Sequence, residues 1–194
     1  MQVNNNKNIP PSTATRCIIL NGTSSSGKTS VAKALQLEMP NLLHLQIDSI
    51  GDLYFGMFPP GYDDSFTDKW EEPTFRCRKQ ITEIFLKCAL TMMKSGYNLC
   101  LDTILDGPDS IENMNYYLET LIEYTPIFIG VLCDLSITEV REKQRGNRRI
   151  GLSREQIEGG MHKNCSYAFT IDTSYTSPFE NAKIILSKIE KQER

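Results

Sequence analysis

The stretch GTSSSGKTS, at Gly22–Ser30, decides the fold, and it directly follows the apolar run CIILN at 17–21. Residues 22–29 match the pattern G-x-x-x-x-G-K-[ST] at every fixed position. In this pattern the glycines let the backbone curl until successive N–H groups point at phosphate oxygens, and the next helix presents its positive end to the same anion. A simple Gly/Ser turn before a helix is the alternative. The apolar strand before the stretch and the amphipathic helix after it favour a phosphate-binding loop.

Two side chains give this loop its chemistry. Lys28 is expected to bridge the β- and γ-phosphates of a nucleotide, and the Thr29 hydroxyl is expected to bind Mg²⁺. We therefore predict ATP and Mg²⁺ as cofactors, with Lys28 as a catalytic residue and Thr29 as a metal ligand. The predicted nucleotide-binding residues are Gly22, Thr23, Ser24, Ser25, Ser26, Gly27, Lys28, Thr29 and Ser30.

Strand-like apolar runs alternate with helix-like periodic segments along the rest of the chain. This alternation predicts an α/β fold with three α/β/α layers around a mostly parallel, five-stranded sheet. Strands are expected at 16–21, 42–47, 97–102, 126–133 and 168–172, with a helix at 28–39. A later long helix is expected to bury a face made of Ile81, Ile84, Phe85, Cys88, Ala89 and Met92.

Capping patterns mark several helix starts. In a capping box, a hydroxyl and a carboxyl or amide three residues later satisfy backbone N–H groups of the first turn. The pattern occurs at 136–139 (SITE), 153–156 (SREQ) and 177–180 (SPFE), and DSIE at 109–112 is a fourth candidate. Each is predicted to begin a helix.

Two aspartates end predicted strands, at the edge of an α/β sheet where ligands bind. A phosphotransferase with a hydroxyl acceptor needs a carboxylate that orients the nucleophile and takes its proton. We predict Asp48 as this catalytic base; capping of the segment 49–54 is the alternative, and both roles are compatible. Asp102 is predicted on the metal side, in contact with Mg²⁺ directly or through water, against a turn role at the strand end. Asp48, Ser49 and Asp102 are the predicted substrate contacts, while Asp52, Asp63, Asp64, Asp68 and Asp106 are expected to be solvated loop acids.

An arginine-rich stretch, REKQRGNRRIG, spans Arg141–Gly151. A cationic connection between helices fits a kinase lid that closes over the nucleotide, excludes water and neutralises phosphoryl charge. We predict an Arg-rich lid at about 141–153, with Arg145 and Arg148 as the catalytic phosphate contacts, because guanidinium groups bind phosphate bidentately. A solvated basic face is the alternative.

Three further features fit around this site. The stretch at 55–73 is rich in Pro, Gly and Asp, and we expect a long acceptor-side loop with short helical turns. His162 is expected to pack or to lie at the surface rather than to act in catalysis. His44, within a predicted strand, is expected to be structural.

Composition sets the remaining limits. The chain has 194 residues, 40% of them hydrophobic, and a net charge of -3, which predicts one domain at 16–194 and no nucleic-acid or membrane partner. The polar stretch at 1–15 is expected to be a disordered tail rather than a secretory signal. The 6 cysteines form no CxxC pair, so free thiols in a reducing cytoplasm are expected. A homo-oligomer is left open.

The order of these stretches resembles the chloramphenicol phosphotransferase-like proteins. The resemblance is carried by IILNGTSSSGKTS, IDSI, LCLDTIL, VLCDLSITEVREKQRGNR and HKNCSYAFTIDTS, and it covers about Cys17–Leu186. It implies a P-loop NTPase kinase-like fold and ATP-dependent phosphorylation of a small-molecule hydroxyl, with the base at Asp48 and lid arginines at the level of Arg145 and Arg148. The stretch at 55–73 departs from the family where the acceptor should bind, so the acceptor need not be chloramphenicol.

Two other functions compete with a small-molecule kinase. A nucleotide-binding regulator such as a GTPase switch would carry an [NT]KxD motif. The NKNI at 6–9 is not such a motif, because it lacks the Asp and precedes the first strand. A kinase acting on RNA or protein would need a binding groove that the acidic composition does not indicate. A small hydroxyl-bearing acceptor is therefore the predicted partner.

Overall fold

The computed structural model of the chain describes residues 16–57, 72–107, 109–146, 150–163 and 165–192. The predicted tail at 1–15 and Arg148 lie outside these residues, as does most of the stretch at 55–73. In chain order the elements are β1 (Cys17–Asn21), α1 (Lys28–Glu38), β2 (Leu42–Gln46), α2 (Ile47–Gly56), α3 (Glu72–Lys94), β3 (Asn98–Thr103), α4 (Ser110–Thr120), the 3-10 turn η1 (Ile122–Tyr124), β4 (Ile127–Leu132), α5 (Leu135–Arg145), α6 (Leu152–Glu158), β5 (Phe169–Asp172) and α7 (Pro178–Gln192).

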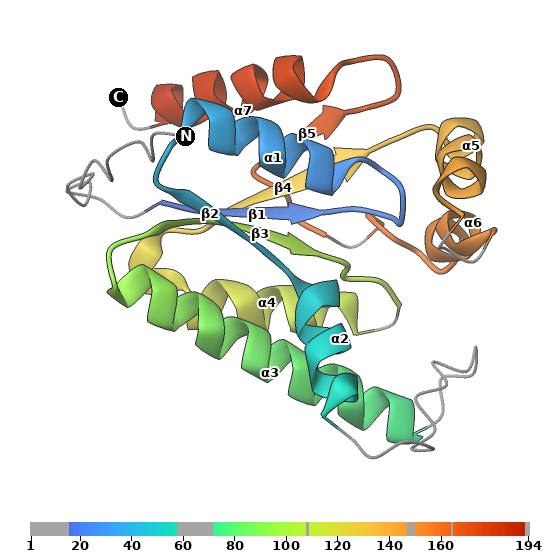
Figure 1. Ribbon diagram of the computed structural model, residues 1–194, viewed down its shortest axis with the longest axis horizontal. Helices are drawn as coiled ribbons and strands as arrows, with labels where there is room; N and C mark the ends of the chain where they lie inside the picture. The colour runs from blue at the N-terminus through green and yellow to red at the C-terminus, as the bar shows by residue number, and fades with distance from the viewer. Residues whose placement is uncertain (1–15, 58–71, 108, 147–149, 164, 193–194) are drawn as a thin grey trace, which may run out of the picture.

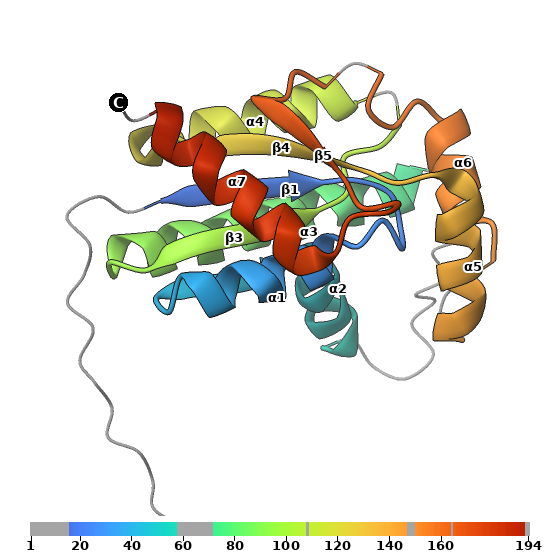
Figure 2. The same ribbon diagram turned by 90° about the horizontal axis from the view of Figure 1, so that it is seen from above.

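The five strands form one sheet in the order β2-β3-β1-β4-β5, and every neighbouring pair is parallel. Helices α1 and α7 cover one face of this sheet, and α2, α3 and α4 cover the other (Figure 1). The predicted three-layer α/β/α fold is therefore confirmed. Helices α5 and α6 lie beyond the carboxyl ends of the strands in both views (Figures 1 and 2).

Alternate side chains of β1 enter two apolar cores, one on each face of the sheet. Ile19 packs with Phe85 of α3, whereas Ile18 packs with Val31 of α1 and Ile185 of α7. All residues of β1 are buried, as expected for a central parallel strand covered on both faces. The end of β1 is thus a rigid base for the loop that follows it.

Helix α3 is present as predicted, and Ile81, Phe85 and Ala89 of its predicted face are buried, with Ile84 as the exception. Ile84 is 38% exposed, and Leu86 and Met93 are buried in its place. Ile84 and Leu86 flank this shared stripe on opposite sides and both are apolar, so periodicity alone does not decide which of them is buried. Packing in the core buries Leu86.

Only one of the capping boxes forms as predicted. Ser177 Oγ accepts from the Glu180 N–H at 3.2 Å, and the Glu180 carboxylate accepts from the Ser177 N–H at 3.0 Å. Asp109 precedes α4 without a side-chain capping bond. Helices α5 and α6 begin at Leu135 and Leu152, so the other two candidate serines lie inside the first turns. The N-caps of α5 and α6 are Asp134 and Gly151, two positions before the serines that the pattern would place there.

Helix α2 follows β2 without an intervening loop. Asp48 is therefore the second residue of a helix, not the last residue of a strand. Both ends of the predicted loop at 55–73 are helical as well, because α2 runs to Gly56 and α3 begins at Glu72. Among the described helices, none combines the length and the hydropathy that a membrane span needs.

Candidate active site

The loop between β1 and α1 curls tightly at the carboxyl end of the sheet. Ser25 and Gly27 have positive φ angles of 57° and 92°, and Val31 is the first residue whose N–H reaches a carbonyl one turn back, Gly27 O at 3.0 Å. The backbone N–H groups before Val31 therefore point out of the N-terminal end of α1, as they do in an anion-binding site. Gly22 serves another purpose, because a Cβ there would lie 2.5 Å from Val131 O of β4.

Lys28 lies within the loop and is 7% exposed. Its Nζ donates to the carbonyl oxygens of Gly22 and Thr23, both at 2.9 Å. The Nζ also lies 3.8 Å from Asp102 Oδ1. The ammonium charge is thus held beside the backbone amides that a phosphate would bind.

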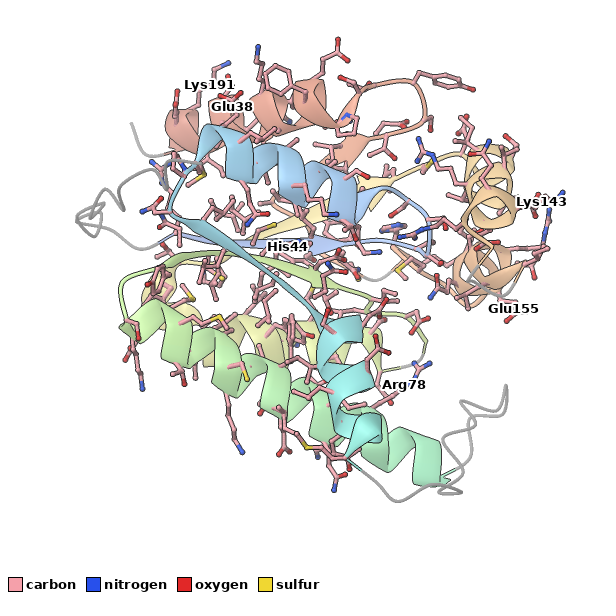
Figure 3. The ribbon with its side chains drawn as sticks, in the orientation of Figure 1. Glu38, His44, Arg78, Lys143, Glu155 and Lys191 are labelled. Atoms are coloured by element: carbon pink, nitrogen blue, oxygen red, sulfur yellow. The ribbon has the colours of Figure 1, made fainter. Side chains whose placement is uncertain are left out.

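Asp102 joins three elements at the sheet edge. Its Oδ2 accepts from the Thr29 hydroxyl at 2.7 Å and lies 3.5 Å from His44 Nε2 of β2. Burial raises the pKa of Asp102, but the nearby His44 ring, the charge of Lys28 and the hydrogen bond from Thr29 outweigh it and leave the pKa below its ordinary value. The carboxylate is therefore charged at neutral pH. The sequence predicted only a structural role for His44, whose place in the sheet Figure 3 labels.

The serine hydroxyls of the loop are also buried. Ser24, Ser25 and Ser26 are 4%, 7% and 0% exposed, and no hydrogen-bond partner of their hydroxyls lies among the described residues. Buried polar groups are normally hydrogen-bonded. A polyanion such as a nucleotide triphosphate fits this set, because it supplies many acceptor oxygens.

One cavity of about 360 Å³ joins the predicted catalytic groups. Lys28, Asp48 and Asp102 all line it. Arg145, which is exposed at the end of α5, lines it too, whereas Ser49 is exposed and does not. The full lining is Ser24, Ser25, Gly27, Lys28, Thr29, Ser30, Val31, Gln46, Ile47, Asp48, Asp102, Ile104, Arg141, Gln144, Arg145, Thr173, Thr176 and Pro178.

Asp48 occupies the first turn of α2 and is half-buried. A negative charge there is favoured by the helix dipole. The alternative role, capping a helix at 49–54, does not apply because α2 begins at Ile47. Asp48 lines the cavity, and its role as catalytic base stays a prediction.

Arg141 contacts the phosphate loop, and the sequence did not single it out. Its Nη2 donates to Thr173 O at 2.8 Å, and its Nη1 lies 3.4 Å from Ser25 O and 3.3 Å from Cys133 Sγ. Arg141 precedes Arg145 by four residues on α5, a spacing that places both on one helix face. That spacing was the signal available in the sequence. The predicted lid itself stays a prediction.

A hydrogen-bonded chain continues from the end of β1. Asn21 Oδ1 accepts from the Leu105 N–H at 2.7 Å, which leaves Asn21 Nδ2 to donate to Tyr167 Oη at 2.9 Å. The Tyr167 hydroxyl can then donate to His162 Nδ1, 2.7 Å away. Burial, then the charge of Lys28, lowers the pKa of His162 to about 4, so the ring is neutral at pH 7. His162 is half-buried and bonded, which agrees with the predicted packing role.

One predicted solvated acid has a partner. The Asp106 side chain is only 10% exposed and forms an ion pair with Arg78 of α3 at 3.2 Å. The prediction for Asp106 was therefore wrong, because the loop after β3 folds back against α3 (Figure 3). Asp52 is exposed as predicted. The remaining acids predicted to be solvated, Asp63, Asp64 and Asp68, lie outside the described residues.

The described residues contain no group of three or more His, Cys, Asp or Glu side chains that could hold a metal by themselves. Mg²⁺ seldom uses such a cage, because it keeps waters and shares phosphate oxygens with one or two protein oxygens. The Thr29 hydroxyl and the charged Asp102 carboxylate are hard oxygen donors, 2.7 Å apart. These two residues therefore fit the predicted metal position.

Comparisons with known proteins agree on family and fold. Residues 15–190 match the family model described as chloramphenicol phosphotransferase-like protein. No curated protein sequence matches the chain. Similar solved structures include the APS kinase of Mycobacterium tuberculosis with AMPPNP and APS, at 14% identity over 93% of this chain and 99% of that chain with a TM-score of 0.64. Another is the shikimate kinase of Acinetobacter baumannii with shikimate, which has a TM-score of 0.62 at 18% identity over 92% of this chain and 94% of that chain. At these identities the likeness shows the fold of P-loop kinases.

Proposed function

This chain belongs to the chloramphenicol phosphotransferase-like family, and on that premise we propose that it transfers the γ-phosphoryl group of ATP to a hydroxyl group of a small molecule. One observation carries the proposal. The candidate phosphate-binding lysine, Lys28, the candidate metal-side acid, Asp102, and the candidate base, Asp48, line one cavity of about 360 Å³. That volume lies in the range of ordinary small-molecule sites.

The phosphate loop would hold the nucleotide. The first-turn amides of α1 and the Lys28 ammonium bind oxygens of the β- and γ-phosphates. The Thr29 hydroxyl and Asp102 would hold Mg²⁺, Asp102 directly or through water, and the bound ion would neutralise charge on the phosphates. Arg141 and Arg145 line the same cavity and add positive charge where the phosphoryl group transfers.

Asp48 would activate the acceptor. Its carboxylate orients the acceptor hydroxyl and takes the hydroxyl proton while the oxygen forms a bond to the γ-phosphorus. The bond between the γ-phosphorus and the β,γ-bridging oxygen breaks, and ADP leaves with that oxygen. The products are a phosphate monoester, ADP and a proton.

A small acceptor is supported by the similar structures. The neighbouring kinases were solved with small molecules, shikimate in one case and APS in the other. We also place the reaction in the cytoplasm, because ATP is abundant there. The described cysteines, which are Cys17, Cys88, Cys100, Cys133 and Cys165, are all free thiols, as a reducing compartment would keep them.

The test is a search for the acceptor. The purified chain is incubated with ATP, Mg²⁺ and hydroxyl-bearing metabolites and antibiotics, and mass spectrometry records any compound that gains one phosphate. The Lys28→Met variant is the matched control, and it should lose the product by about a thousandfold. A chain that binds no nucleotide, or that phosphorylates only protein or RNA, would overturn the proposal.

A further inference from the structure

A glutamine outside the motif contacts the phosphate loop directly. Gln156 of α6 is 8% exposed, and its Oε1 accepts a hydrogen bond from the Ser24 N–H at 2.6 Å. The sequence predicted a capping role for this residue, which it does not fill. The Ser24 amide belongs to the loop, yet its partner comes from a helix 132 positions further along the chain.

Helix α6 is joined firmly to α5. The Glu142 carboxylate, fully buried on α5, accepts from the N–H groups of Gly151 and Ser153 at 2.9 and 2.8 Å. Arg154 of α6 also pairs with Glu139 of α5 at 2.7 Å. On the outer side of this helix pair Lys143 and Glu155 project away from the sheet (Figure 3). The two helices therefore form one unit.

Each helix of this unit contacts one of two adjacent residues of the phosphate loop. Gln156 of α6 binds the amide of Ser24, and Arg141 of α5 lies 3.4 Å from the carbonyl of Ser25. Ser25 is the one non-glycine residue of the loop with a positive φ. This conformation costs free energy and persists only where the surrounding structure holds it. The two contacts flank that residue and keep it in place.

The chemistry of the side chain matters as well as its position. An amide oxygen accepts the Ser24 N–H without bringing a negative charge to the phosphate site. A carboxylate at the same place would make the same bond but would repel a bound polyphosphate, since close charges interact strongly where water is excluded. Glutamine combines the acceptor with neutrality.

We propose that Gln156 is a positioning residue for the nucleotide. It fixes Ser24 and Ser25 so that the amides at the start of α1 converge on the phosphates, and it ties the α5–α6 unit, with Arg145, to the loop. This inference depends on the proposed nucleotide binding. Gln156 itself touches the loop and not the reacting atoms.

The test compares two substitutions of matched size. Gln156→Met removes the acceptor, and Gln156→Glu keeps it but adds a negative charge. Glu158→Gln, on the same helix with its side chain 68% exposed, is the control. Calorimetry measures the dissociation constants of ATP, ADP and adenosine in the presence of Mg²⁺, and thermal unfolding without nucleotide reports folding.

The expected results differ between the variants. Gln156→Met should weaken ATP about tenfold, because the Ser24 amide loses its buried partner. Gln156→Glu should melt near the wild-type temperature and weaken ATP more than ADP, and ADP more than adenosine, because its effect is repulsion of phosphate charge. Glu158→Gln should bind all three within about twofold of wild type.

The outcomes separate the two proposals. If the wild-type chain binds ATP and both Gln156 variants bind it equally well, Gln156 is not a positioning residue. Equal weakening of ATP and adenosine by Gln156→Glu would also overturn the inference, because a general structural defect does not distinguish phosphate number. If Gln156→Met fails to fold, the Glu variant still decides. Failure of the wild type to bind any nucleotide instead overturns the proposed function.

Discussion

The phosphate side and the acceptor side of the cavity are held in different ways. On the phosphate side, the Asp102 side chain is 8% exposed and lies within 4 Å of groups from Lys28, Thr29 and His44. On the acceptor side, Asp48 is half-buried in the first turn of α2. The contacts of the first carboxylate cross three elements, whereas the second carboxylate lies in the first turn of one helix on the cavity wall.

This difference indicates what substitutions on each side should change. Contacts that cross elements preorganise the phosphate side, so a change there should alter loop structure, stability and nucleotide affinity together. A change at Asp48 should alter the transfer step and leave the loop intact. The two halves of the reaction should therefore be separable by substitution, and four experiments can break or sharpen that contrast.

The largest effect is expected at Asp48. Asp48→Asn removes the base but keeps the size of the side chain, so kcat for phosphoryl transfer should fall about a thousandfold. The dissociation constant of ATP should stay within about twofold of wild type, because the phosphate loop is untouched. Steady-state kinetics with the identified acceptor and calorimetry with ATP measure the two quantities. Unchanged kcat would remove Asp48 from the role of base, and lost ATP binding would show that the two sides are coupled.

A pair of glycines tests the structural half of the contrast. Gly22→Ala should destabilise the fold by about 2 kcal/mol, because the new Cβ would meet the Val131 carbonyl oxygen at 2.5 Å, a backbone atom that cannot move away easily. Gly51→Ala in α2 is the control, since the nearest atom there is Ile81 Cδ1 at 3.9 Å. It should stabilise the helix by about 0.5 kcal/mol. Urea unfolding without nucleotide measures both changes in the free energy of unfolding. Changes of the same sign in the two variants would contradict the contrast between the two sides of the cavity.

The same contrast explains what the sequence could predict. The phosphate loop is one consecutive stretch, so its curl, its lysine and the helix after it are local properties that a motif describes. The bonds that hold the loop are not local: Arg141 and Ser25 are 116 positions apart, and Gln156 and Ser24 are 132 apart. No pattern of spacing along the chain indicates such pairs before the fold brings them together.

The errors have the same origin. The buried face of α3 was predicted with Ile84 in place of Leu86, because both side chains are apolar and only packing against neighbouring elements decides which of them is buried. The start of α6 was assigned to Ser153, while Glu142 of another helix satisfies its amides. The strands, and the polar residues at their ends, were predictable because each depends on a few neighbouring residues in the sequence. Contacts between elements required the structure.

Two arginines on one helix give the next prediction. Arg141→Lys loses the planar fork that spans Thr173 and the loop, so the dissociation constant of ATP should rise about tenfold. Arg145→Lys, one helical turn later and exposed, should raise it less than about threefold. Calorimetry of both variants measures the difference. A larger effect at Arg145 would support the prediction from the sequence, which named Arg145 and not Arg141 as a phosphate contact. It would also contradict the view that contacts between elements hold the phosphate side.

The smallest effect is expected in the pH dependence of stability. The pKa of His162 is lowered to about 4 by burial and by the charge of Lys28. An unfolded chain takes up this proton below about pH 6.5 while the folded chain does not, so the free energy of unfolding should decrease from about pH 6.5 to about pH 4. His162 has a φ of 73°, which asparagine tolerates well, so His162→Asn should remove part of that decrease without straining the backbone. Urea unfolding at about pH 7 and about pH 4.5 measures it. The lowered pKa of Asp102 affects the free energy of unfolding mainly below this pH range. If the free energy of unfolding decreases equally in the wild type and in His162→Asn, His162 does not titrate as its surroundings require.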